Sequence, residues 1–254
     1  MTTDVSAVLR SAAYRPAGHA VVQQSAHAVP GPGRLGAACA AAALIVTVAL
    51  TGCSSTPPTP DWQMNAHGAV QKATQAYLAG QTRVELLEWN HARAEVGRTG
   101  RVDLLARVEL TRCAAQVASL DPAPCDRFEA LRPDAPEAER AYADYLAGRP
   151  VANAVAQLPE AQRAVASTGS AAALAAIQDP LSRLVAAGVL FKTGAASPAV
   201  ASIAMETASG QGWRRPLMAW LALEARRAQA AGDAEAAAAL QRRLAVVEGS
   251  PGTR

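Results

Sequence analysis

Apolar positions recur at helical spacing from Asp61 almost to the C-terminus, and glycine or proline interrupts the pattern at intervals. No stretch alternates apolar and polar residues as a half-buried strand requires. Thr82 and Glu85 have the spacing of a capping box, and Gly80 and Gly148 are natural helix stops. The pattern therefore predicts an all-α domain. The expected helices cover residues 62–79, 82–100, 102–120, 125–131, 137–148, 150–157, 159–167, 170–178, 180–192, 198–208, 214–230 and 234–247.

One short motif is repeated along the chain. The sequence "AYLAGQ" at 76–81 returns as "DYLAGR" at 144–149, which places Tyr77 and Tyr145 sixty-eight residues apart. This separation is twice the period of about 34 residues that characterises tetratricopeptide repeats, which the motif resembles. The stretch 220–244 also resembles a helix pair of that family.

The tetratricopeptide resemblance implies an array of antiparallel helix hairpins stacked as an α-solenoid. Two features depart from it. Glu85 stands where the family has a small residue, and residues 150–194 fit no repeat register. A plain array of helix hairpins without true repeats is therefore the alternative.

The segment before the helical region has the pattern of an export signal. Residues 35–52 carry no charge, and Arg34 precedes them. An apolar run of about 16 residues is short for a membrane span and suits the core of a signal peptide. The run ends in "LTGC" at 50–53, which resembles the lipobox of bacterial lipoproteins. That resemblance implies a diacylglycerol on the sulfur of Cys53, cleavage before it, and acylation of the new amino group.

The lipoprotein resemblance divides the chain into four parts. They are a cleaved signal peptide (1–52), the lipidated cysteine with a proline-rich linker (53–60), a helical domain (61–248) and a flexible tail (249–254). Ser54, rather than an aspartate, follows the modified cysteine, which implies sorting to the outer membrane rather than the inner one.

Two other interpretations of the leader remain open. Cys53 is incidental if the apolar run is an ordinary secretory signal or a single membrane span. The segment of roughly 34 residues before the apolar run is also long for such a leader. This length favours a true start near Val21 or Val22 over a disordered cytoplasmic tail.

Composition limits the partners of the helical domain. Alanine makes up about a quarter of the chain, whereas there are only two Phe, four Tyr and four Trp, which indicates closely packed helices. The net charge is +3, and Lys72 and Lys192 are the two lysines. Acidic and basic residues nearly balance after Cys53, so we expect no nucleic-acid partner.

The four cysteines also fit export. The signal peptide would remove Cys39, and lipidation would consume Cys53, which leaves Cys113 and Cys125 in the helical domain. An oxidising compartment favours a disulfide between them. Two free thiols or a metal site are the alternatives, but no nearby residues complete a zinc site, and we expect neither metal nor cofactor.

No catalytic motif is recognisable. His67 and His91 lack a metalloprotease pattern, and the glycines of "GQG" at 210–212 lack the lysine of a phosphate loop. Glu206 and Glu224 are candidate acids for peptidoglycan cleavage only by elimination. We assign no catalytic residue, and the sequence favours a binding protein over an enzyme.

The segment "ETASGQGWRRPLMAW" at 206–220 is the best candidate for partner binding. It combines a glycine-rich loop with Trp and Arg, the residue types most enriched at interaction hot spots. The candidates are Trp213, Arg214, Arg215 and Trp220. In the alternative interpretation, Trp213 fastens the loop to the helices and the arginines pair with nearby carboxylates.

The stretches 179–194 and 208–220 resemble proteobacterial lipoproteins of unassigned activity, and this resemblance implies no activity. We expect a membrane-anchored periplasmic lipoprotein whose helices bind an envelope protein or peptide. An enzyme acting on peptidoglycan and a purely structural lipoprotein are the alternatives.

Overall fold

The computed structural model of the protein describes residues 59–249. The predicted signal peptide, Cys53, nearly all of the linker and the last five residues lie outside the described residues. Within 59–249 every regular element is a helix and there is no strand. The predicted all-α class is therefore confirmed.

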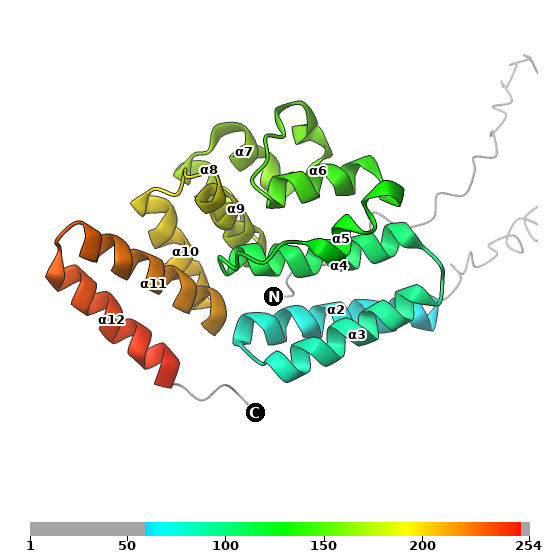
Figure 1. The fold of residues 1–254 in the computed structure, drawn as a ribbon, viewed down its shortest axis with the longest axis horizontal. Coiled ribbons are helices and arrows are strands. Elements are labelled where there is room, and N and C mark those ends of the chain that lie inside the picture. The colour runs from blue at the N-terminus through cyan, green and yellow to red at the C-terminus, as the bar shows by residue number, and fades with distance from the viewer. Residues whose placement is uncertain (1–58, 250–254) are drawn as a thin grey trace, which may run out of the picture. The chain divides into compact units, whose positions relative to one another are not determined.

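The helices follow one another through short connections (Figure 1). Their bounds are α2 Asp61–Ala79, α3 Thr82–Gly97, α4 Val102–Ala118, α5 Asp126–Glu129, α6 Glu137–Leu146, α7 Glu160–Thr168, α8 Ala171–Ala176, α9 Pro180–Lys192, α10 Pro198–Gly210, α11 Arg214–Ala230 and α12 Ala234–Gly249. The 3₁₀ helices are η1 Arg132–Asp134 and η2 Ala152–Gln157. The predicted bounds agree to within a few residues, but 150–157 forms a 3₁₀ helix, and Gly249 belongs to α12.

The helix ends follow from local chemistry. Gly80 after α2 and Gly148 after α6 have φ values of 81° and 73°, a left-handed conformation that glycine adopts without steric cost. The Asp179 side chain caps α9 by accepting a hydrogen bond from the Ser182 backbone N–H at 2.7 Å. These signals are local, which is why the sequence pattern locates the ends well.

The predicted capping box at the start of α3 is wrong. The N-cap is Gln81, which makes no side-chain capping bond, and Thr82 is the first helical residue. Glu85 is buried, and one of its carboxylate oxygens lies 3.5 Å from the Arg215 guanidinium. Glu85 thus contacts α11 instead of the end of its own helix.

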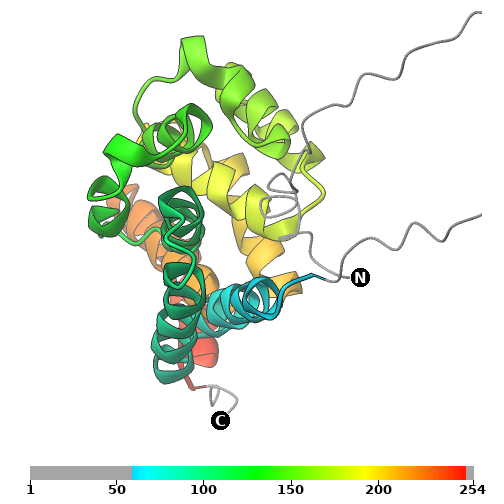
Figure 2. The ribbon, with the colours of Figure 1, turned by 90° about the vertical axis from the view of Figure 1, so that its right-hand side faces the viewer.

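The helices form hairpins that contact one another across large sequence separations. Helices α2 and α3 form one hairpin, and α11 and α12 form another. Helix α4 packs against α9 and also against α2 and α3. Figure 2 shows α2 beside α3 and α4. Helix α11 contacts both α10 and α2.

The contacts of α2 with α11 and of α4 with α9 differ from those of a solenoid. Each repeat of a solenoid contacts only its neighbours in the sequence. The array of helix hairpins is present in part, but the tetratricopeptide-like stacking is not confirmed. The repeated motif forms the C-terminal ends of α2 and α6, and its tyrosines Tyr77 and Tyr145 are both buried. The motif therefore marks two similar helix ends.

The core is built from alanine and leucine around a few large side chains. Trp89, Trp220 and Phe128 are among the largest side chains that are fully buried. Helix α9 approaches α4 closely at Gly188, where a β-carbon would lie 2.1 Å from the backbone oxygen of Val117. The small residues thus permit close helix contact, as the composition predicts.

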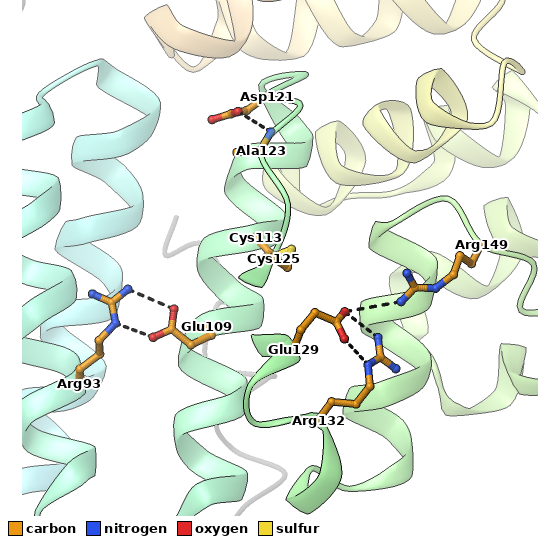
Figure 3. The surroundings of a disulfide bond; sticks show 9 residues. All are labelled: Arg93, Glu109, Cys113, Asp121, Ala123, Cys125, Glu129, Arg132 and Arg149. Atoms are coloured by element: carbon orange, nitrogen blue, oxygen red, sulfur yellow. Dashed lines mark hydrogen bonds and ion pairs between the residues drawn. A yellow bond between two sulfur atoms is a disulfide. The ribbon is translucent and has the colours of Figure 1, made fainter. Parts of the chain in front are cut away.

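The predicted disulfide is present and joins α4 to the segment that follows it. Cys113 and Cys125 are bonded, with their Cα atoms 5.8 Å apart (Figure 3). Close by, Arg93 of α3 donates two hydrogen bonds to Glu109 of α4, one of them at 3.1 Å. The covalent bond fixes the loop after α4, and the ion pair joins α4 to the α2–α3 hairpin.

A search of residues 59–249 for membrane spans finds no helix that combines sufficient length and apolar character to cross a bilayer.

Candidate functional site

A pocket lies where the C-terminal half of α2, the start of α3 and the loop between α10 and α11 meet. Its volume is about 390 Å³. We call it the Trp213 pocket. It is lined by Lys72, Gln75, Ala76, Ala79, Gln81, Val84, Gln211, Gly212 and Trp213.

Trp213 joins the α10–α11 loop to α2. Only 5% of its surface is exposed, and its indole Nε1 donates a hydrogen bond to Oε1 of Gln75 at 3.2 Å. Gly212 before it has φ 65°, which lets the chain turn sharply into α11. The indole therefore forms a fixed wall of the pocket.

The pocket has a distinct chemical character. Lys72 is its one charged lining residue, and no carboxylate, histidine, serine or cysteine lines it. Three glutamine side chains add amide groups, and Ala76, Ala79 and Val84 form an apolar portion. The lining therefore suits the binding of a polar or anionic ligand, and the Lys72 amine is its one side-chain group of a kind that acts as a nucleophile.

Helices α2, α3 and α11 also contribute to a second group of polar side chains, which we call the Arg215 cluster and in which Tyr77 and Glu85 are buried. It consists of Tyr77, Thr82, Glu85, Asp121 and Arg215. The Arg215 guanidinium carbon lies 4.1 Å from the centre of the Tyr77 ring, and a guanidinium nitrogen donates to the Thr82 hydroxyl at 3.3 Å. The Tyr77 hydroxyl donates to an Asp121 carboxylate oxygen at 3.2 Å. The cluster connects α11, α2, α3 and the loop after α4.

Burial changes the acid–base behaviour of two members of the cluster. Burial raises the pKa of the Glu85 carboxyl, and the positive charge of Arg215 opposes that rise. Burial, reinforced by the negative charge of Asp121, raises the pKa of Tyr77 to about 12. Tyr77 therefore stays neutral across the physiological range and acts as a hydrogen-bond donor.

Replacing Tyr77 with phenylalanine is expected to change how stability depends on pH above about 10. The folded wild type keeps the phenol proton up to about pH 12, whereas an unperturbed tyrosine has a pKa of 10.0. Between these values the folded state binds more protons than the unfolded state. The free energy of unfolding therefore falls as pH rises, by at most about 1.4 kcal/mol per pH unit, and the variant lacks this fall.

Urea unfolding of the wild type and the variant at about pH 8 and about pH 11 measures this difference. At the lower pH the variant should be less stable by about 1 kcal/mol, because it lacks the hydrogen bond to Asp121. At the higher pH this deficit should shrink or reverse. An equal deficit at both pH values would contradict the raised pKa of Tyr77.

The predicted partner-binding residues have different places in the structure. Trp220 is 0% exposed and donates from Nε1 to the Ala118 carbonyl at 3.3 Å, so its proposed contact with a partner is wrong. Arg214 donates to the Val247 and Glu248 carbonyls at the end of α12.

The other two predicted residues, Trp213 and Arg215, lie at the Trp213 pocket and in the Arg215 cluster. The alternative interpretation of segment 206–220, in which these side chains hold the domain together, therefore describes most of the contacts. Trp213 fastens the α10–α11 loop to α2, and Arg215 pairs with the Glu85 carboxylate. Of the four candidates, only Trp213 lines the pocket.

Sequence reasoning missed the contribution of α2. Lys72 and Gln75 line the pocket, yet they belong to no motif that indicates binding. The hydrogen bond between Gln75 and Trp213 spans 138 residues of sequence. The polar glutamine beside the repeated "AYLAGQ" motif is the only local signal, and it is weak.

The candidate acids and histidines lie elsewhere. Glu206 is exposed and accepts a hydrogen bond from Ser202, and Glu224 pairs with Arg227 at 2.8 Å. His91 is exposed and lies near Glu95, at 3.3 Å. In the described part of the chain, no group of three or more His, Cys, Asp or Glu is arranged to hold a metal ion.

Comparison of the chain with protein-family models, curated proteins and solved structures finds no match.

Proposed function

We propose that this protein is a lipoprotein of the cell envelope whose helical domain binds a protein or peptide in the periplasm. A diacylglycerol on Cys53 would hold it at a membrane, the outer membrane rather than the inner one. The apolar run that ends in "LTGC" at 50–53 supports the anchor. The disulfide between Cys113 and Cys125 supports export, because such bonds persist in oxidising compartments.

The Trp213 pocket is the observation that carries the binding proposal. The α2–α3 hairpin and the α10–α11 loop, which are far apart in the sequence, meet there, and the Trp213–Gln75 hydrogen bond fixes its wall. A preformed pocket binds with a small cost in conformational entropy. The absence of carboxylate, hydroxyl, thiol and imidazole groups from its lining favours capture of a ligand over its chemical conversion.

Photo-crosslinking in intact cells tests this function. A photoreactive amino acid at Val84, which lines the pocket and is 44% exposed, should yield an adduct of discrete mass with an envelope protein or peptide. The adduct should appear in the membrane fraction. Combining the probe with Cys53→Ala should remove both the processed chain and its adduct from that fraction, because the acyl anchor is lost.

Two matched controls accompany the experiment. The same probe at Met64, an exposed apolar residue near the opposite end of α2, should give no such adduct. Cys39→Ala, which changes a cysteine within the predicted leader, should leave processing and membrane association unchanged. The same adducts from Val84 and Met64 would contradict the binding site, and processed Cys53→Ala protein at the membrane would contradict the anchor.

A further inference from the structure

The Trp213 pocket presents a positive charge that nothing in the described residues neutralises. Lys72 is exposed, and it has no ion pair within residues 59–249. Its neighbours one helical turn away on α2 are Gly68, Ala69, Gln75 and Ala76, none of which is acidic. The ammonium group is therefore available to an anionic ligand in the pocket.

The Trp213 indole orients the amide of Gln75. An indole N–H only donates, so Oε1 of Gln75 must be the atom that accepts its hydrogen bond at 3.2 Å. This assignment leaves both N–H groups on Nε2 of Gln75 for another acceptor. Gln211, on the loop across the pocket, adds a further side-chain amide. The pocket thus gathers hydrogen-bond donors around Lys72 without any acidic group.

An apolar track leads out of the same pocket. Ala76, Ala79 and Val84 form the apolar part of its lining. One turn further along α3, Leu87 is 68% exposed and lies on the same side of the helix as Val84. An extended chain that enters the pocket by its end can place apolar side chains on Val84 and Leu87. A volume of about 390 Å³ suits the last few small residues of such a chain.

From these observations we propose that the Trp213 pocket binds the C-terminal carboxylate of a peptide that ends in small residues such as alanine. The carboxylate would accept hydrogen bonds from Lys72 and from the Gln75 amide, and the preceding residues would follow the track over Val84 and Leu87. This inference rests on the proposed binding function and specifies the ligand class of the same pocket. A free carboxylate matches the donors because it only accepts hydrogen bonds.

The test uses two small peptides that differ at one group. Acetyl-trialanine with a free carboxylate and the same peptide with a C-terminal amide are titrated into the full-length protein in detergent micelles. The indole N–H resonance of Trp213, assigned with Trp213→Phe, reports occupation of the pocket. We expect the acid to shift this resonance saturably and the amide to bind at least about tenfold more weakly, the loss typical of one charge-assisted hydrogen bond.

Two lysine variants identify the group that binds the carboxylate. Lys72→Gln should weaken binding of the acid by about tenfold and leave binding of the amide unchanged. Lys192→Gln changes the other lysine of the chain, which does not line the pocket, and should bind the acid like the wild type. Both variants alter exposed side chains, so both should fold.

The outcomes separate this inference from the proposed function. Equal affinity for acid and amide, no shift with the acid, or unchanged binding by Lys72→Gln would each overturn the carboxylate proposal. An adduct from the Val84 probe would still support a binding module in those cases. If the Val84 probe gave no adduct, the proposed binding function would be overturned.

Discussion

Replacing Gly188 with alanine is expected to lower the free energy of unfolding of the helical domain by about 3 kcal/mol or more. This is the upper end of the range that is typical of overpacked cores. The new β-carbon would lie 2.1 Å from the backbone oxygen of Val117 and 2.8 Å from its carbonyl carbon. Rotation of a side chain cannot relieve a clash with backbone atoms, so α9 and α4 must move apart. The greater helix propensity of alanine, about 1 kcal/mol, offsets only part of this cost.

Gly68→Ala is the matched control for this prediction. Gly68 also lies inside a helix, but a β-carbon there would meet no atom within 4 Å. Its replacement should stabilise the protein by about 0.5 to 1 kcal/mol. Urea unfolding of both variants measures the difference. If the two substitutions changed stability alike, the close contact between α9 and α4 would be contradicted.

The helix bounds could be predicted because their signals are local. Gly80 and Gly148 end α2 and α6 in left-handed conformations, and Pro180 and Pro198 open α9 and α10. Each of these residues acts on its own turn of backbone, so a pattern of a few residues is enough to locate the helix end. The disulfide was predicted by a different route, from cysteine number and the expected compartment.

The packing of the helices could not be predicted in the same way. Gly188 has no side chain, and nothing near it in sequence indicates that Val117 lies opposite. Glu85 shows why a local pattern can mislead. Its spacing from Thr82 fits a capping box, but Arg215 of α11 contacts both residues and determines their places. Tertiary contacts between distant helices override such local preferences.

Only the loop side of the candidate site could be predicted, because the contacts that bring α2 to this loop are between residues far apart in the sequence. The loop that carries Trp213 is distinctive because tryptophan is rare in this chain and two glycines, Gly210 and Gly212, come just before it. Lys72 and Gln75 are ordinary polar residues on a helix, and such residues look the same in sequence whether they face solvent or a pocket. The burial of Trp220 reflects the scarcity of aromatic side chains, since within residues 59–249 most of them are buried in the core.

Removal of the disulfide is the second change with a large expected effect. The double variant Cys113→Ala, Cys125→Ala should lose about 3 kcal/mol of stability, because the bond closes a short loop in the unfolded chain. The loop also carries Asp121, which accepts hydrogen bonds from the Tyr77 hydroxyl and, at 2.9 Å, from the Ala123 N–H. Loss of the bond should therefore also loosen the Arg215 cluster.

Urea unfolding with and without dithiothreitol measures the contribution of the bond. Reductant should bring the wild type down to the stability of the double variant and leave the double variant unchanged. Any other cysteine of the purified chain is also present in the double variant, so the response of that variant to reductant controls for other thiols. A wild type whose unfolding midpoint is unchanged by reductant would contradict a stabilising bond. If the midpoint falls as expected, the oxidising compartment on which the proposed function depends becomes a requirement for full stability of the fold.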